Sequence, residues 1–310
     1  MALKPVTFSA DPGDQSWYEA SARARLAGLL DAESFQEFIG PEQRMMSPHL
    51  PLFDLPRAFD DGMIVGRGRL DGQAVLAAAQ EGRFMGGAFG EIHGAKLVGL
   101  LRAALAEAPA ALLILFDTGG VRLQEANAGE TAIAEVMRAI AQVRAAGIPV
   151  IGLIGGRAGC YGGGGLIAGT CSRLVVSESG RISVSGPEVI ETNKGAEEFD
   201  SRDRALVWRT MGGKHRRLLG GADAFVGDTI GAFRDAALTQ IAKAPAFDLA
   251  TLEAEQARLE ARLARFGDCH DATEVWGRLG VNDPDAVPGM TTEAFDALLA
   301  RLPEAPHDAR

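Results

Sequence analysis

A run of glycines directly after an apolar segment is the feature that most constrains the fold of this chain. Residues 148–154 are typical of a buried strand, residues 155–171 are rich in glycine, and residues 174–176 predict another strand. Glycine lets the backbone amides at the start of a helix lie bare and close to a ligand. Such amides can hold a developing oxyanion. The order of residues therefore predicts a strand, a ligand-binding turn, a short helix and a second strand.

A second glycine turn follows another apolar run. Residues 111–116 predict a buried strand, and Thr118, Gly119 and Gly120 come directly after it. Ligands of α/β sheets bind where the strands end, so we expect both turns to face one pocket. Two such turns predict an oxyanion hole with two donors, which would stabilise an enolate made from a thioester. Taken singly, either turn also fits an ordinary packing or connecting role.

The rest of the chain alternates between strands and helices. Two β-like runs flank Asp71-Gly72, which is a strong signal for a hairpin of residues 63–70 and 73–80. Further helices are expected at residues 91–108, 130–146 and 163–171, and further strands at 148–154 and 173–177. This alternation predicts an α/β fold.

Three regions are expected along the chain. Residues 1–45 predict a helical arm, in which one helix follows Ser21 and a second starts at Asp31. Residues 46–245 form the main domain, and residues 246–310 form a C-terminal helical segment.

Three charged segments each have two interpretations. Residues 248–266 predict an amphipathic helix that is either a surface helix or a partner-binding one, with Leu252, Leu259 and Leu263 on its apolar stripe. The basic run 214–217 is either a solvated face or a contact for an acidic carrier or a phosphate. Residues 197–204 fit either a salt-bridged loop or a loop at the active site or at a subunit contact.

Composition narrows the function further. The net charge of −10 and the pI near 5.1 argue against a nucleic-acid surface. Three cysteines without a CxxC pair favour a reducing compartment, so we expect a cytoplasmic protein without structural zinc or another metal. The sequence contains no run of 18 apolar residues, so it predicts no membrane span. The motifs GxxxxGK[ST], GxGxxG, GxSxG and HExxH are also missing, which disfavours nucleotide-binding, serine-hydrolase and zincin functions.

Several motifs, in this order and number, resemble the carboxyltransferase β subunits of acetyl-CoA carboxylases. They are Gly66-Arg-Gly, Ala77-Ala-Ala-Gln, Phe84-Met-Gly-Gly, Gly90-Glu-Ile-His-Gly, Thr118-Gly-Gly-Val-Arg-Leu-Gln-Glu and Ser185-Gly-Pro-Glu-Val-Ile-Glu. The resemblance spans roughly residues 20–225 and implies a crotonase-like fold, a β-β-α superhelix. The four-cysteine zinc ribbon of the bacterial subunit is missing. Residues 197–204 and 275–284 instead resemble the β subunits of biotin-independent malonate decarboxylases.

This second resemblance implies a reaction and its partners. A malonyl thioester on an acyl carrier protein would lose carbon dioxide and become an acetyl thioester. The carrier's arm is a 2′-(5″-phosphoribosyl)-3′-dephospho-CoA, so this chain would bind no cofactor directly. A γ subunit of the same fold would complete the active site, and an acyl carrier protein transferase subunit is a further possible partner.

The resemblance to crotonases also assigns roles to residues. It places Gly162, Gly163 and Gly164 at the start of a helix, with the Gly163 amide as one oxyanion donor and the turn at Gly119-Gly120 as the source of the other. Leu166 and Glu188 take the positions of the two catalytic glutamates of a hydratase, so hydration is disfavoured. Substrate contacts are expected from Gly86, Gly87, His93, Arg122, Tyr161 and Gly164.

The acid that protonates the enolate stays open among His93, Glu188, Tyr161 and a residue of the γ subunit. Two other functions also stay open. One is a carboxyltransferase β subunit of a biotin-dependent acyl-CoA carboxylase, which predicts a biotinylated partner and avidin-sensitive activity. The other is a non-catalytic assembly subunit, in which changes at the two glycine turns would affect association alone.

Overall fold

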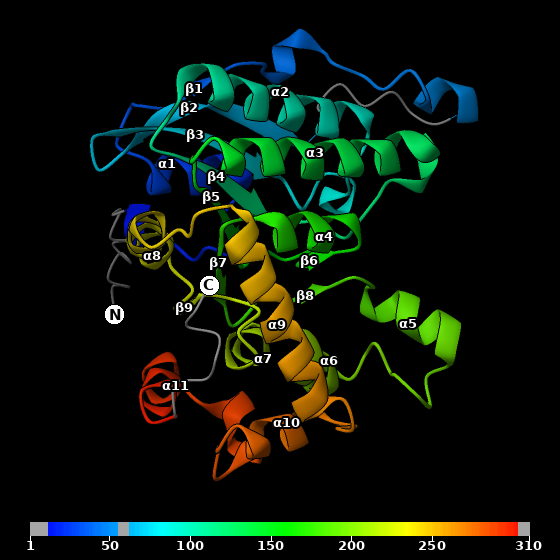
Figure 1. Cartoon of the computed structure of the whole chain (residues 1–310). Coiled ribbons are helices and arrows are strands. Elements are labelled where there is room, and N and C mark those ends of the chain that lie inside the picture. Colours follow the sequence, from blue (N-terminus) through cyan, green and yellow to red (C-terminus); the bar gives the residue numbers. More distant parts are fainter. Residues whose placement is uncertain (1–11, 55–61, 303–310) are drawn as a thin grey trace, which may run out of the picture.

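A seven-stranded sheet forms the centre of the molecule (Figure 1), whose computed structural model describes residues 12–54 and 62–302. Its strands lie in the order β1-β2-β3-β4-β5-β7-β9. The first two pairings are antiparallel and the other four are parallel. The strands are β1 (Gln36–Glu37), β2 (Met63–Leu70), β3 (Gln73–Gln80), β4 (Ala111–Phe116), β5 (Val150–Ile154), β7 (Arg173–Ser177) and β9 (Ala224–Val226).

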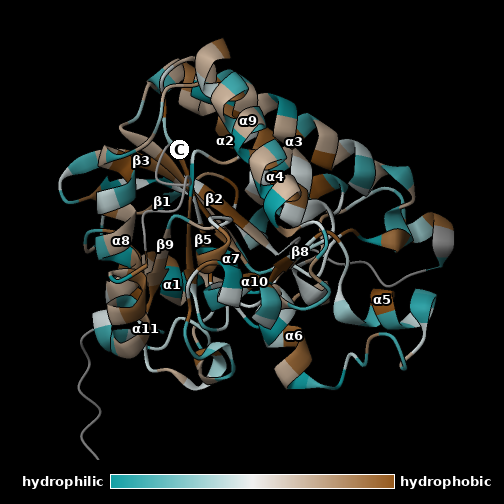
Figure 2. Ribbon diagram, turned by 60° about the horizontal axis from the view of Figure 1, so that its bottom comes forward, coloured by the Kyte–Doolittle hydropathy of each residue, from teal (hydrophilic) through white to brown (hydrophobic). Residues whose placement is uncertain are grey.

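Helices cover both faces of this sheet. On one face, α2 (Glu91–Glu107) and α3 (Asn127–Ala145) lie side by side (Figure 1) and share a core with Leu112, Ile114 and Phe116 of β4. On the other face, α1 (Ala22–Leu29) and α8 (Ile230–Ala242) pack against the alternate residues of the same strand. Because both faces are covered, the central strands are continuously apolar, as their colour in Figure 2 shows.

The remaining elements lie beyond the carboxyl ends of the parallel strands and along the C-terminal segment. A small parallel sheet pairs β6 (Cys160–Tyr161) with β8 (Ile182–Ser183). The helices are α4 (Gly163–Thr170), α5 (Pro187–Lys194), α6 (Arg204–Met211), α7 (Gly213–Leu218), α9 (Leu249–Phe266), α10 (Ala272–Arg278) and α11 (Thr292–Leu299). Helix α5 projects from the body (Figure 1).

Most of the expected elements are confirmed. The hairpin turns at Asp71 and Gly72, whose φ angles of 51° and 74° fit a tight turn of the type that Asp-Gly favours. The described strands and helices form the expected α/β fold, with helices on both faces of the central sheet. Helix α3 begins at Asn127, three residues before the expected start. In the described part of the chain, no helix is long and apolar enough to cross a membrane.

The second helix expected at Asp31 is wrong. The Asp31 carboxylate accepts hydrogen bonds from the amides of Asp71 and Gly72 at 3.0 and 2.8 Å, so it caps the hairpin turn. The chain then forms β1, which pairs with β2. Asp31 therefore accepts hydrogen bonds from the distant hairpin turn and does not cap a helix of its own segment, as the sequence suggests. Residues 1–11 of the expected arm lie outside the described residues.

The C-terminal segment is helical, as expected, and is held to α7. Lys214 donates from Nζ to the carbonyls of Pro288 and Met290, and Trp276 donates from Nε1 to Nδ1 of His215 at 3.2 Å. The apolar stripe of α9 stays exposed, since Leu263 keeps 72% of its surface. The first half of the basic run is thus structural, because Lys214 and His215 are buried.

Candidate active site

The two glycine bends lie against each other at the carboxyl ends of adjacent parallel strands, β4 and β5. The Thr118 amide donates to the Gly159 carbonyl at 2.8 Å, and the Tyr161 amide donates to the Thr118 carbonyl at 2.9 Å. A β-carbon at Gly162 would lie 3.1 Å from the Cα atom of Gly120. The shared pocket expected from the two turns is therefore geometrically possible, because the bends meet there.

The glycines that open α4 are required by close packing. A β-carbon at Gly163 would overlap the side chain of Ile133 on α3, and one at Gly164 would overlap the methyl group of Thr118. At Gly165 it would lie 2.6 Å from the Ser183 carbonyl oxygen. The run is thus neither a flexible loop nor an accident of composition. It lets α4 pack tightly between α3, the first bend and β8.

The amides at the start of α4 have no acceptor within the described residues. No side chain caps this helix, and the amides of Gly162, Gly163 and Gly164 donate to no described group. Helix N-termini carry unsatisfied N–H groups and a partial positive charge, and both attract anions. This end of α4 is therefore prepared to accept a hydrogen-bonded anion.

The first bend offers fewer donors than the sequence suggests. The Gly119 amide already donates to the Gly86 carbonyl at 2.8 Å. The Gly120 amide donates to the hydroxyl of Thr118 at 3.1 Å, an acceptor that a rotation about χ1 can withdraw. A β-carbon at Gly87 would overlap the Asp117 carbonyl, so Gly86 and Gly87 support this bend from behind. Of the two candidates in this bend, Gly120 is the better placed to donate to a ligand.

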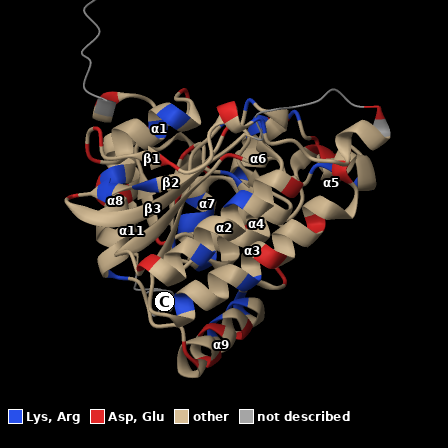
Figure 3. Cartoon of the chain, turned by 90° about the horizontal axis from the view of Figure 1, so that it is seen from above, with Lys and Arg blue, Asp and Glu red and all other residues tan. Residues whose placement is uncertain are grey.

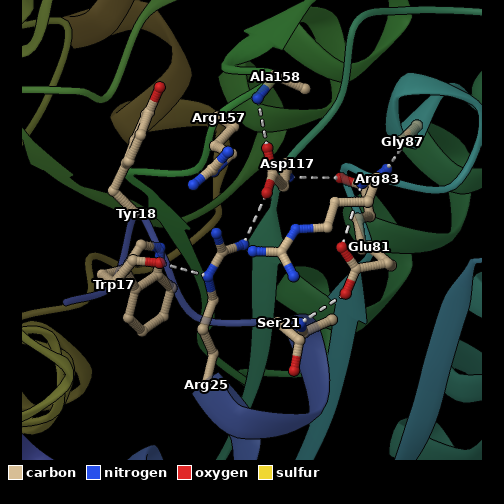
Figure 4. Close-up of polar contacts among 12 residues, drawn as sticks. Trp17, Tyr18, Ser21, Arg25, Glu81, Arg83, Gly87, Asp117, Arg157 and Ala158 are labelled. Atoms are coloured by element: carbon tan, nitrogen blue, oxygen red, sulfur yellow. Dashed lines mark hydrogen bonds and ion pairs between the residues drawn. The ribbon is translucent and has the colours of Figure 1, made fainter. Parts of the chain in front are cut away.

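Asp117 joins the two bends, a role that sequence reasoning missed. Its carboxylate accepts from the Ala158 amide at 2.7 Å and pairs with Arg25 of α1 at 2.8 Å (Figure 4). The pair is buried, and Gln80 accepts from the Asp117 amide. Arg25 also donates to the Trp17 carbonyl. The N-terminal arm therefore supports the site, and the only sequence signal for this was an acidic residue at the end of an apolar strand.

Arg122 and His93 lie in the interior. Arg122 pairs with the fully buried Glu125 at 3.1 Å, and Glu125 also accepts from the Glu91 amide at the start of α2. His93 is fully buried against Phe89, and its burial, together with the positive charge of Arg122, holds its pKa well below its ordinary value. A buried neutral imidazole is a poor proton donor, so the structure favours an architectural role for both residues.

Tyr161 ends β6, directly before Gly162, and Glu188 lies at the start of α5. Tyr161 is 5% exposed, and its pKa is raised by burial, while Arg181 opposes this shift and the nearby Glu188 adds to it. Glu188 lies exposed in the first turn of α5. Leu166 is 44% exposed on α4, at the position that the comparison with hydratases highlights.

Exposed apolar side chains flank the bends. Leu123 follows the first bend directly and is 82% exposed, and Val184, whose carbonyl lies near Gly162, is 63% exposed. Val189 on α5 is also more than half exposed. Exposed apolar side chains beside a candidate site are typical of a protein interface.

These features define the class of the chain. A model of the carboxyl transferase domain matches residues 19–212, and the chain belongs to that family. It is 38% identical to the malonyl-S-ACP:biotin-protein carboxyltransferase of Malonomonas rubra, over 93% of this chain and 97% of that protein. It is 31% identical to the methylmalonyl-CoA carboxyltransferase 12S subunit of Propionibacterium freudenreichii, over 56% of this chain and 32% of that protein.

Solved structures place the chain more narrowly. A chain of the Pseudomonas malonate decarboxylase hetero-tetramer in complex with malonate is 40% identical, with a TM-score of 0.77 over 86% of this chain and 97% of that one. The transcarboxylase 12S structure is 25% identical, with a TM-score of 0.61 over 74% of this chain and 41% of that one. The chain is thus an enzyme homologue of the malonate decarboxylase subunits, which confirms the resemblance found in its motifs.

Proposed function

We propose that this chain is the β subunit of a malonate decarboxylase, a lyase that converts malonyl-S-acyl carrier protein into acetyl-S-acyl carrier protein and carbon dioxide. The observation that carries the proposal is the contact between the Gly120 bend and the start of α4, where the Gly163 amide has no acceptor among the described residues. The likeness to the Pseudomonas malonate decarboxylase supports the choice of substrate.

The chemistry needs little beyond these amides. When the C–C bond breaks, its electron pair moves onto the thioester oxygen and carbon dioxide leaves. The Gly163 N–H, joined by the Gly120 N–H once the Thr118 hydroxyl rotates away, stabilises the resulting enolate more than the neutral carbonyl, so the two donors lower the barrier. The α4 dipole adds to this effect because its positive end faces the same oxygen. A proton then adds to the enolate carbon, with Glu188, Tyr161 or a γ-subunit residue as the donor.

The proposal includes partners. A γ subunit would cover the apolar residues Leu123, Val184 and Val189, and the acyl carrier protein would deliver the thioester on its dephospho-CoA arm. The likeness to a chain of a Pseudomonas malonate decarboxylase hetero-dimer supports pairing with a second subunit. We further propose a cytoplasmic location, which the three free thiols support.

Transfer of the carboxyl group to a biotin protein is the second candidate, because the Malonomonas relative carries that name. Both reactions pass through the same enolate and differ in the fate of the carbon dioxide. The test is carbon dioxide release from a malonyl thioester by the purified complex, with and without avidin. Release that avidin does not inhibit supports decarboxylation, whereas avidin-sensitive turnover supports biotin as the acceptor. An absence of turnover in both conditions contradicts both candidates.

A further inference from the structure

A cavity lies between α7, the C-terminal end of α9 and α10, away from the residues of the two glycine bends. Its volume of about 440 Å³ falls within the range of roughly 300–1,000 Å³ that is typical of small-molecule sites. Most of its wall is apolar and comes from Leu219, Leu259, Leu263, Phe266, Ala272 and Val275. The space and its lining therefore suit a small molecule with an apolar part.

One polar group of the wall is fixed in its orientation and protonation. The indole of Trp276, which can only donate, donates from Nε1 to Nδ1 of His215 at 3.2 Å. Nδ1 therefore carries no proton. Burial lowers the pKa of His215 to about 3, so the ring is neutral at ordinary pH and its one proton is on Nε2. The His215 ring thus presents a single N–H donor, which the Trp276 hydrogen bond holds in place.

This N–H donor has no acceptor within the described residues. The hydrogen bond at Nδ1 is the one that the His215 side chain makes there, and Nε2 is not sealed from solvent, because the ring lines the cavity. The residue as a whole is only 8% exposed. An N–H group that loses most of its water without gaining an acceptor costs free energy. A ligand in the cavity that carries an acceptor would remove this cost.

The charged side chains of the wall favour an anionic acceptor. Helix α9 carries charges of both signs (Figure 3), and of these Arg262 lines the cavity. Asp271 lines it as well, but its carboxylate already pairs with Arg209 at 3.1 Å and accepts from the amide and the hydroxyl of Thr273 at 2.8 and 2.9 Å. A carboxylate both accepts from an N–H donor and balances a guanidinium charge.

We propose that this cavity binds a small organic carboxylate with an apolar chain. The carboxylate accepts from Nε2 of His215 and lies beside Arg262. The chain covers Leu259 and Leu263, which are 45% and 72% exposed without it. The inference does not depend on the proposed function, because no residue of the wall belongs to the bends.

The chain contains its own reporter of occupancy. Cys269 lines the cavity as a partly exposed free thiol, so a bound molecule should shield it from alkylation. The probe is octanoate, and the measurement is the rate at which iodoacetamide labels Cys269 in the full chain as octanoate is added. Octanoate should slow the labelling to a plateau. Acetate, which lacks the chain, and 1-octanol, which lacks the charge, should each need a concentration at least about 10-fold higher.

Two sets of variants test the residues. H215N keeps an acceptor for Trp276 but ends short of the Nε2 position, so the octanoate concentration for half-protection should rise by about 10- to 100-fold. L263S and L249S are a matched pair, because the two leucines are 72% and 70% exposed on the same helix and, of the two, only Leu263 lines the cavity. L263S should weaken the protection of Cys269, and L249S should leave it unchanged.

Several results would overturn the proposal. They are labelling that octanoate does not slow, equal protection by octanoate and 1-octanol, and equal protection in the wild type and a folded H215N. Equal protection in L263S and L249S would overturn it too, whether or not H215N folds. A Cys269 that is unreactive in the assembled complex before octanoate is added would show that a partner subunit covers the cavity instead.

Discussion

Gly162 lies against Gly120 so closely that a β-carbon at Gly162 would stand 3.1 Å from the Gly120 Cα atom. Gly162 also has a φ of 56° and a ψ of −132°, a conformation that a residue with a β-carbon adopts at a cost of about 1–3 kcal/mol. G162A should therefore lower the free energy of unfolding by about this amount and slow carbon dioxide release, because it forces the bends apart. Urea unfolding of the chain and turnover by the complex measure the two effects.

Gly169 provides the control within the same helix. A β-carbon there would meet nothing within 4 Å, and its φ is not in the left-handed region. G169A should stabilise the chain by about 0.5–1 kcal/mol and leave turnover intact. Equal stability of G162A and wild type would show that the contact between the bends is looser than described.

Asp117 should be among the most sensitive positions away from the reacting atoms. D117N leaves Arg25 as a buried charge without its counter-ion, and breaking such a pair costs about 3–5 kcal/mol. Adding R25M to D117N should cost little more, because the pair is already broken. E135Q at the exposed Arg138–Glu135 pair is the comparison and should cost less than about 1 kcal/mol. Additive losses in the double variant would show that Arg25 and Asp117 act independently.

His215 should make stability depend on pH. Burial and, secondarily, Arg216 lower its pKa to about 3, so the folded chain keeps it neutral where the unfolded chain protonates it. The contribution of His215 to the free energy of unfolding is therefore fully present above pH 6.5. It is lost as the pH drops toward 3, by about 1.4 kcal/mol per pH unit.

H215N tests this pH dependence, because its side-chain oxygen can accept the Trp276 hydrogen bond without titrating. Between about pH 7 and pH 5, the wild type should lose about 2 kcal/mol more than H215N in urea unfolding. Identical losses would mean that His215 takes up its proton without unfolding.

The cysteines should differ in reactivity. Burial raises the pKa of Cys160 well above its usual range and that of Cys171 to about 12, so neither forms a thiolate at neutral pH. Cys269 is partly exposed. A thiol reagent should therefore label one cysteine of the folded chain quickly and all three after unfolding. Rapid labelling of Cys160 would show that β6 opens readily, and C269S should abolish the fast phase.

Local patterns predicted the parts of the fold that depend on local chemistry. A few neighbouring residues are enough to predict the buried strands β4 and β5, which are continuously apolar, and the hairpin turn at Asp71-Gly72. The helix predicted at Asp31 was wrong because the Asp31 carboxylate accepts a hydrogen bond from a residue 40 positions away, at the hairpin turn. The hydrophobic periodicity of a sequence does not predict such a long-range hydrogen bond.

The candidate site was predictable only in outline. Glycines after two buried strands indicated two bends, and their contact follows from the parallel pairing of β4 and β5. That the Gly119 amide is already used by Gly86 depends on the packing of a third segment. The link from Asp117 to Arg25 spans 92 residues, so no local pattern predicts it.

The most direct measurement of the central claim removes one hydrogen-bond donor, the N–H of Gly163, from the assembled complex. Because a β-carbon at Gly163 overlaps Ile133, the comparison is G163P/I133A against G163A/I133A, which share the packing change and differ in the N–H and in the proline ring that replaces it. Proline is tolerated at the first position of a helix. If this amide holds the enolate oxygen, the proline variant should release carbon dioxide about 10²- to 10³-fold more slowly than the alanine variant. Equal rates from two equally folded complexes would contradict the account.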